Sequence, residues 1–173
     1  MTHTFINDIT LLELTARQYK LAGLDHNLLA KEVLAHLSDR LSDDPNSGLI
    51  EDSVLEIPEG SESRRLVAMV DEIAKTKNMY TTSQWGQIHR PLESTNTHHH
   101  GTSPFAWVYY VQAPPGAGDL TFWFLDRFRF SVKPVEGNLI LFPGWMNHSV
   151  SKNRGNGIRI SIAGNLTQNI NTP

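Results

Sequence analysis

The stretch GNLILFPGWMNHSV, residues 137–150, decides the fold class together with KNRGNGIRISIAG, residues 152–164. Both contain short runs of β-branched, aromatic and aliphatic residues that are bounded by glycine, proline or asparagine. Such runs are typical of strands, and the turn residues follow one another too closely for a helix to fit between them. We therefore expect strands over Asn138–Phe142, Trp145–Val150 and Ile158–Gly164.

The same pattern extends back along the chain to residue 80. It predicts four earlier strands, over Tyr80–His89, Phe105–Gln112, Leu120–Leu125 and Arg129–Pro134. Seven closely spaced strands with short turns indicate an all-β sandwich or a jelly roll rather than βαβ units. The second half of the chain is thus predicted to be a β structure.

The first half of the chain has a helical pattern instead. Apolar residues at three- and four-residue steps predict one helix from a cap at Asp25 to about Leu41, and another from a cap at Ser61 or Ser63 to about Asn78. Residues 10–22 are ambiguous between helix and strand, and residues 43–60 are predicted to be a mobile loop. We expect a single domain over 1–173, with helical support over 1–79, a β core over 80–166 and a tail over 167–173.

Composition and charge exclude several classes of function. The 173 residues include 15 Lys and Arg against 18 Asp and Glu, a net charge of −3, and no cysteine. Thiolate metal sites, disulfides and cysteine nucleophiles are therefore excluded, and no basic run suited to nucleic acid is present. The first ten residues do not resemble a secretory signal, and no apolar run reaches the ~20 residues that span a bilayer. We expect a cytoplasmic protein without nucleic-acid or membrane partners.

Histidines provide the densest chemical signal. His98, His99 and His100 are consecutive, and His148 follows on a later predicted strand. Residues two apart in an extended chain point to the same side, so His98 and His100 can converge on one ion while His99 points away. A third imidazole from His148 would complete a facial set with open positions for small ligands. A solvated histidine stretch with no metal is the alternative.

Arg159 and Ser161 form the second signal. On the predicted strand they share one face, while the isoleucines at 158, 160 and 162 share the other. If this is an edge strand, Arg159 faces water. If it faces a cleft, its planar guanidinium can hold a carboxylate through two parallel hydrogen bonds, with the Ser161 hydroxyl adding a third.

Taken together, these signals resemble the iron(II)- and 2-oxoglutarate-dependent oxygenases, in particular the small prolyl-hydroxylase-like members. The resemblance covers roughly Trp85 to Leu166 and rests on His98-x-His100, Val108-Tyr109-Tyr110-Val111, Gly118-Asp119-Leu120, Pro134-x-x-Gly137-x-Leu139-Ile140-Leu141-Phe142-Pro143, His148 and Arg159-x-Ser161. It implies a double-stranded β-helix, which is a cupin-like jelly roll, with the N-terminal helices packed on its outer sheet.

The resemblance also implies an activity and a set of site residues. The protein is expected to be a non-haem iron dioxygenase, a hydroxylase that couples decarboxylation of 2-oxoglutarate to oxidation of an unidentified substrate by dioxygen. His98 and His148 match the family's iron-binding histidines, Arg159 matches the arginine that holds the far carboxylate of 2-oxoglutarate, and Ser161 and Tyr110 lie beside it. The apolar walls are expected from Val108, Leu120, Phe122 and Leu139, and a substrate mouth from Trp85, Trp145, Gln87 and Asn96.

One position departs from the family pattern. The second ligand is usually Asp or Glu, but His100 occupies that position here. Three imidazoles leave iron(II) at +2, whereas a carboxylate would lower the charge to +1, so metal preference and reactivity can change. Asp119 and Asp126 are the candidate replacement carboxylates, although turn roles are commoner at strand ends.

Two other functions stay open from the sequence. One is a cupin-like metalloprotein that uses the same three histidines without 2-oxoglutarate, and the other is a metal-free jelly-roll binding module. The sequence does not identify the substrate or the oligomeric state.

Overall fold

The computed structural model describes residues 14–37, 60–125 and 127–168. In chain order the described elements are β1 (Arg17–Lys20), α1 (His26–Leu37), α2 (Glu62–Lys75), β2 (Met79–His89), β3 (Thr95–His98), β4 (Phe105–Gln112), β5 (Leu120–Phe124), β6 (Phe128–Val132), β7 (Asn138–Pro143), β8 (Asn147–Val150) and β9 (Arg159–Gln168). The predicted order of helices first and strands afterwards is confirmed, apart from β1.

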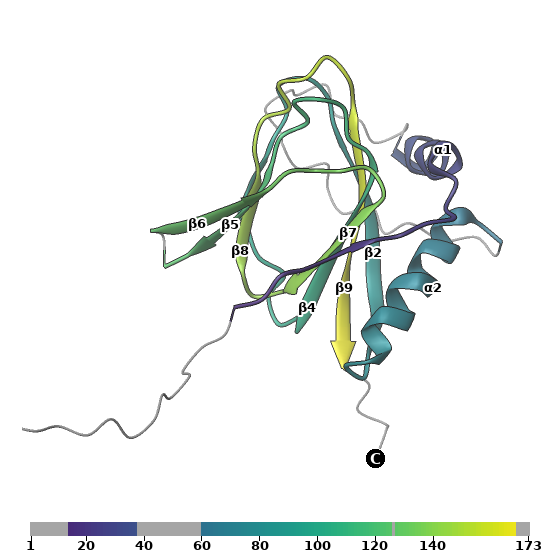
Figure 1. Cartoon of the computed structure of the whole chain (residues 1–173), viewed down its shortest axis with the longest axis vertical. Helices are drawn as coiled ribbons and strands as arrows, with labels where there is room; N and C mark the ends of the chain where they lie inside the picture. Colours follow the sequence, from purple (N-terminus) through teal and green to yellow (C-terminus); the bar gives the residue numbers. More distant parts are fainter. Residues whose placement is uncertain (1–13, 38–59, 126, 169–173) are drawn as a thin grey trace, which may run out of the picture.

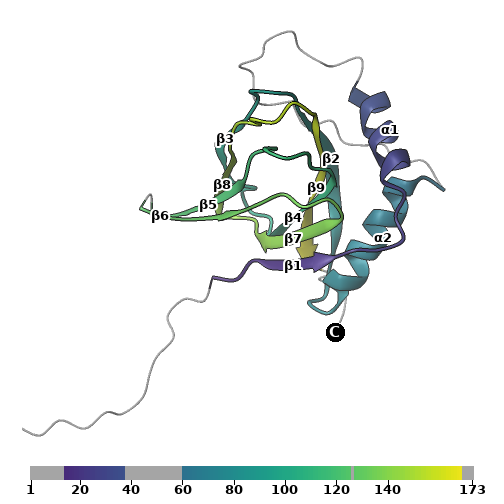
Figure 2. The ribbon, with the colours of Figure 1, turned by 45° about the horizontal axis from the view of Figure 1, so that its top comes forward.

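The strands form two antiparallel sheets that enclose a common interior (Figures 1 and 2). The larger sheet has the order β1-β7-β4-β9-β2, and the smaller one has the order β3-β8-β5-β6. Strands that are neighbours in a sheet are mostly distant in sequence, as in a jelly roll. In both views the β5–β6 hairpin extends away from the side that carries the helices.

The larger sheet separates two apolar cores. The inner core lies between the sheets, and the outer core lies between the larger sheet and the helices. In β4, Val108 and Tyr110 face the inner core, while Trp107 and Tyr109 face the outer core. Because both faces of this sheet are covered, its central strands are apolar along nearly their whole length instead of alternating with polar residues.

Both helices lie on the outer face of the larger sheet, beside β2 and β9 (Figure 1). α1 approaches β2 closely at Gly86, where an added Cβ would lie 2.8 Å from a methyl carbon of Val33. Glycine therefore permits this contact between helix and strand. The predicted packing of helices on the outer sheet is confirmed.

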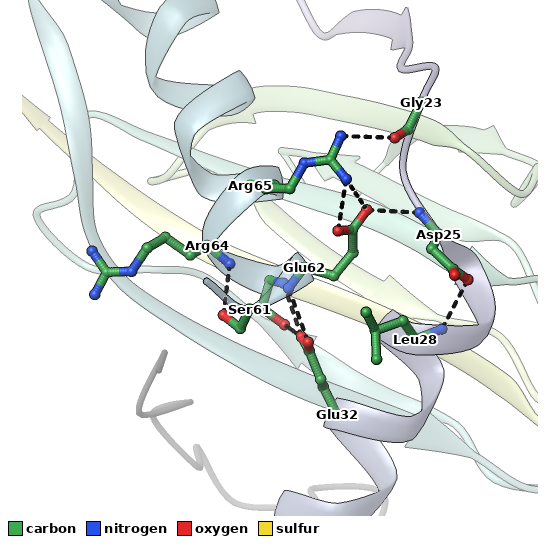
Figure 3. Close-up of polar contacts among 9 residues, drawn as sticks. Gly23, Asp25, Leu28, Glu32, Ser61, Glu62, Arg64 and Arg65 are labelled. Atoms are coloured by element: carbon green, nitrogen blue, oxygen red, sulfur yellow. Dashed lines mark hydrogen bonds and ion pairs between the residues drawn. The ribbon is translucent and has the colours of Figure 1, made fainter. Parts of the chain in front are cut away.

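The two helices also cap one another through the carboxylates of Glu32, which is partly buried, and Glu62, which is buried (Figure 3). Glu32 of α1 accepts hydrogen bonds from the backbone N–H groups of Glu62 and Ser63, each at 2.9 Å, at the start of α2. Glu62 in turn accepts from the backbone N–H of Asp25 at 2.7 Å and is paired with Arg65 at 2.8 Å. A carboxylate at a helix N-terminus satisfies free N–H groups and the positive end of the helix dipole. This network holds α1 and α2 in a fixed relation on the sheet.

The local sequence predictions hold for most elements. All seven predicted strands are present, as β2 and β4 to β9, with ends shifted by a few residues. The caps are also confirmed, because the Asp25 side chain accepts from the Leu28 N–H at 3.0 Å and Ser61 accepts from the Arg64 N–H at 3.2 Å.

Two strands of the structure were not predicted, and some predicted segments lie outside the described residues. β1 falls in the ambiguous stretch 10–22, which had been grouped with the helical part, and β3 was not predicted as a strand. Residues 38–41, most of the predicted loop 43–60 and the tail beyond 168 lie outside the described residues. Neither described helix is long and apolar enough to cross a membrane.

Candidate metal centre

Three histidines predicted as ligands converge inside the jelly roll. His98 at the end of β3 lies directly opposite His148 of β8 in the smaller sheet, and His100 follows two residues after β3. One ring nitrogen from each of the three lies within 4.8 Å of the other two. The side chain of His148 is buried, with 4% exposed, while His98 and His100 are partly buried.

Backbone carbonyl groups orient two of these rings. The Nδ1–H of His98 donates to the Asn96 carbonyl at 2.9 Å, and the Nδ1–H of His148 donates to the Met146 carbonyl at 2.9 Å. A carbonyl oxygen can only accept, so the proton is on Nδ1, and in the neutral ring Nε2 retains a lone pair. Such an outer hydrogen bond sets both the tautomer and the orientation of a metal-binding imidazole.

His100 reaches the same point from a tight turn. Its backbone N–H donates to the Gly144 carbonyl at 2.7 Å, and its ring stacks on Trp85 with 5.4 Å between ring centroids. Gly144 lies between β7 and β8, where an added Cβ would overlap the Ser103 carbonyl oxygen, so this close approach of the two loops requires glycine. The Nε2 atoms of His100 and His148 are 3.2 Å apart. Two cis ligands with metal–nitrogen bonds of about 2.1 Å would be separated by about 3 Å.

The electrostatic environment keeps the imidazoles of His100 and His148 neutral. Burial, with smaller contributions from neighbouring histidines, lowers the pKa of His148 to about 3 and that of His100 to about 4. Only the neutral ring has a lone pair to offer a metal ion. Three imidazoles with converging nitrogens form a donor set that suits iron(II).

The predicted substitute carboxylates do not complete this set. Among the described residues, the cluster of possible ligands contains His98, His100 and His148 and no acidic side chain. Asp119 is not one of its members, and Asp126 lies outside the described residues. The three-histidine set therefore carries no negative charge of its own.

Arg159 lies inside the protein and not on its surface. β9 is an internal strand between β4 and β2, so the alternative of an edge arginine in water is wrong. The Arg159 side chain is 0% exposed, and its Nε and Nη1 atoms have no hydrogen-bond partner. An unpaired buried charge is costly, and no described acidic residue forms a direct ion pair with this arginine, although Asp119 opposes, through charge attraction, the lowering of its pKa by burial.

Two hydroxyl groups accompany this guanidinium. Tyr110 lies opposite Ser161 across the β4–β9 pair, and both hydroxyls are buried without a hydrogen bond of standard geometry. The Tyr110 hydroxyl lies close enough to the Arg159 guanidinium for the two groups to shift one another's pKa. The Arg159 guanidinium carbon is 5.1 Å from the Tyr110 ring centroid. Burial raises the pKa of Tyr110 and lowers that of Arg159. The structure thus brings together the three residues predicted to bind the carboxylate.

A single cavity joins the histidines to the arginine. Its lining consists of Trp85, Gln87, His98, His100, Trp107, Val108, Leu120, Phe142, His148, Val150, Arg159 and Ala163. The predicted wall residues Val108 and Leu120 are among them, and the Phe122 ring lies 6.3 Å from that of His148. Leu139 was wrong as a wall residue, because it faces the outer core.

The substrate-mouth predictions have mixed outcomes. Trp85 and Gln87 line the cavity, whereas Trp145 does not and is 48% exposed. Asn96 is exposed and contributes its carbonyl group to His98. The sequence does not predict that the carbonyl groups of Asn96 and Met146 orient the histidine rings. Every residue type provides a carbonyl group, and only the folded backbone directs it.

A segment in the second half of the chain matches the model of a known family. Residues 126–165, which include His148, Arg159 and Ser161, match the sequence model described as "Putative 2OG-Fe(II) oxygenase". This match agrees with the oxygenase family expected from the sequence, and its description names iron(II) and 2-oxoglutarate, the two cofactors expected with that family. No curated protein matches the chain.

Solved structures with this fold include other oxygenases. A prolyl-4-hydroxylase from Pseudomonas putida superposes with a TM-score of 0.66 at 16% identity, over 90% of this chain and 89% of that one. The collagen prolyl hydroxylase of Paramecium Bursaria Chlorella virus-1, solved with 2-oxoglutarate, has a TM-score of 0.64 at 15% identity, over 88% and 96%. The carbocyclase SnoK from nogalamycin biosynthesis has a TM-score of 0.66 at 14% identity, over 90% and 80%. At these identities the likeness supports the jelly-roll fold and does not identify a substrate.

Proposed function

We propose that this protein is an iron(II)- and 2-oxoglutarate-dependent oxygenase. In this proposal it binds iron(II) through His98, His100 and His148, and the far carboxylate of 2-oxoglutarate through Arg159, Ser161 and Tyr110. The observation that carries the proposal is the single cavity that contains both the converging histidine nitrogens and a buried guanidinium whose Nε and Nη1 atoms have no hydrogen-bond partner. A dicarboxylate with a metal-chelating end matches these two groups in chemistry, because each of its ends meets the group that it needs.

The residues of the site have separate tasks in this proposal. The histidines hold the metal, which supplies the activation of dioxygen when it is bound. Arg159 provides a planar pair of donors for one carboxylate, and the hydroxyls of Ser161 and Tyr110 donate to the same group. Val108 and Leu120 exclude water from the space between the two ends.

His100 gives this site its difference from the usual two histidines and one carboxylate. Because imidazole is neutral, the metal retains its full charge and attracts the anionic co-substrate more strongly. The same absence of charge lowers the attraction of the empty site for the cation. We propose that the site takes up iron(II) more weakly than a site with a carboxylate, and that 2-oxoglutarate contributes more to retaining it.

The buried guanidinium also separates this proposal from the two alternatives. A three-histidine metalloprotein that does not use 2-oxoglutarate, or a metal-free binding module, would leave Arg159 buried without a counterion. Such a burial costs several kcal/mol. We also retain, as proposals from the sequence, a cytoplasmic location and one domain in which residues 1–79 support residues 80–166.

The test measures formation of succinate from 2-oxoglutarate with added iron(II), together with anaerobic titration of the metal and of 2-oxoglutarate. Arg159→Lys is expected to weaken 2-oxoglutarate binding and leave metal binding nearly unchanged, since an ammonium group cannot make the two-pronged contact. Arg154→Lys is the matched control, because Arg154 is an exposed arginine in the loop before β9. Equal loss of both ligands in Arg159→Lys, or no succinate from the wild-type protein, would contradict the proposal.

A further inference from the structure

We propose that His89 is a further binding residue for 2-oxoglutarate, and that its Nδ1–H donates to the carboxylate held by Arg159. This inference rests on the proposed function and extends the carboxylate end of the site from β9 onto β2. His89 is outside the residues 126–165 that match the oxygenase family, and it belongs to none of the motifs described above.

The strand register places His89 at the correct position. His89 is the last residue of β2 and is paired directly with Arg159 of β9. Directly opposite residues in an antiparallel pair have Cβ atoms about 5 Å apart and project from the same face. Trp85 and Gln87, at two-residue steps before His89, line the cavity, so the alternation of β2 directs His89 to the same side.

One nitrogen of His89 is bonded and the other is free. Nε2 lies 2.7 Å from the Thr95 hydroxyl oxygen, whereas Nδ1 is buried and has no partner. The His89 side chain is 3% exposed, so water does not readily compensate Nδ1. A buried polar atom without a partner requires an explanation, and a ligand absent from the free protein is one.

The arrangement indicates which tautomer is present. If Nδ1 were an acceptor, the Arg159 guanidinium opposite it would be a donor close by, yet the free Nε and Nη1 atoms of Arg159 make no bond to it. If the Thr95 hydroxyl donates to Nε2, Nδ1 carries the proton. His89 and Arg159 then present donors side by side, and only an acceptor between them can satisfy both.

Charge explains why this acceptor is an anion. His89 is neutral, because burial and the adjacent Arg159 lower its pKa to about 3. The pair therefore carries a single positive charge, which one carboxylate neutralises. With the hydroxyls of Tyr110 and Ser161, a carboxylate has enough donors for the lone pairs of both oxygens.

Two substitutions distinguish the role of Nδ1 from that of Nε2 in His89. His89→Asn places an amide group near the position of Nδ1 and loses the reach to Thr95. His89→Gln reaches toward Thr95 and leaves the Nδ1 position empty. We expect His89→Gln to raise the Kd for 2-oxoglutarate roughly tenfold or more, the range for a hydrogen bond to a charged group, and His89→Asn to change it less than about threefold. Binding is measured anaerobically with the manganese(II)-loaded protein.

A purely structural role for His89 gives the opposite order. If the bond to Thr95 is all that matters, His89→Asn loses thermal stability and 2-oxoglutarate affinity together, while His89→Gln resembles the wild type. That result would overturn the inference. Equal 2-oxoglutarate affinities in both variants and the wild type would overturn it as well.

A spectroscopic measurement covers the case in which both variants fail to fold. In the wild-type protein loaded with zinc(II), the ¹⁵N signals of the His89 ring are expected to show a proton on Nδ1, and that signal is expected to shift when 2-oxoglutarate is added. A proton on Nε2, or a signal unchanged by saturating 2-oxoglutarate, would overturn the inference.

The same titrations distinguish a failure of the proposed function from a failure of the role of His89 alone. If the wild-type protein does not bind 2-oxoglutarate in these titrations, the proposed function and the role of His89 are both wrong. If the wild type binds it and Arg159→Lys weakens binding while the His89 variants follow the structural order, the role of His89 alone is wrong.

Discussion

The histidine end and the arginine end of the cavity differ in how their polar atoms are satisfied. At the histidine end, backbone carbonyls accept from the Nδ1–H groups of His98 and His148, so the rings are oriented before any metal arrives. At the arginine end, atoms of Arg159, Tyr110, Ser161 and His89 are buried with no partner. The first end is preorganised by the protein, whereas we propose that a charged ligand completes the second end. The two ends should therefore respond to substitution in opposite ways.

The largest effect is expected at the histidine end. His148→Ala removes the buried ligand of the set, and we expect iron(II) affinity to fall roughly more than a hundredfold, because even loss of an outer hydrogen bond costs 10–100-fold. Anaerobic metal titration measures this. His99→Ala is the matched control, since His99 is exposed and its Nδ1 accepts from the Gly101 N–H at 2.9 Å. A comparable loss in His99→Ala would show that the histidine run as a whole, and not a specific set of three, binds metal.

The next effect tests the unpaired charge at the arginine end. Arg159→Met keeps much of the side-chain volume and removes the buried guanidinium. We expect the ligand-free protein to gain roughly 1–3 kcal/mol in free energy of unfolding, while 2-oxoglutarate binding is lost. Urea unfolding without ligand, followed by titration with 2-oxoglutarate, measures both. A less stable variant would mean that Arg159 has a favourable partner in the free protein.

A smaller effect is expected from restoring a carboxylate at the histidine end. His100→Asp should be tolerated and should increase iron(II) retention roughly tenfold, because a negative ligand attracts the cation where a neutral one does not. Dissociation of iron(II) into a chelator measures retention. If the variant fails to fold, His100 has a structural role, for which its stacking on Trp85 is the candidate contact.

The smallest effect concerns pH. The pKa of His89 is about 3 in the folded protein, below its ordinary value of 6.5. Between these values the unfolded chain binds the extra proton, so the free energy of unfolding should decrease as pH falls from about 6.5 toward 3. Urea unfolding from pH 7 to pH 4 should show a shallower dependence in His89→Gln than in the wild type. Parallel profiles would mean that the environment of His89 does not disfavour its protonated form.

Strand periodicity accounts for the predictions that succeeded. The two-residue step in His98-x-His100 and in Arg159-x-Ser161 places each pair on one face whatever the rest of the fold is. It was harder to predict which face of a strand points into the cavity and which points into the outer core. Leu139 was assigned to the cavity and lies in the outer core, because β7 is buried on both faces and its apolar sequence does not distinguish them.

The elements and residues that were missed share a different cause. β3 is short and polar, and it becomes a strand because His98 and Thr95 pair with β8. His89 is one of eight histidines and lacks a motif, and its relation to Arg159 depends on the register between β2 and β9. Register joins residues that are distant in the chain, so no local pattern contains it.

The amino-acid sequence by itself determined the seven apolar strands, the helix caps and which residue types were available for chemistry, because these depend on neighbours within a few positions. The tertiary structure alone decided that three imidazoles share one point, that Arg159 is buried and not solvated, and that His89 lies opposite it. Those properties arise when two sheets close around one interior, which removes water from polar groups and brings strands seventy residues apart into register.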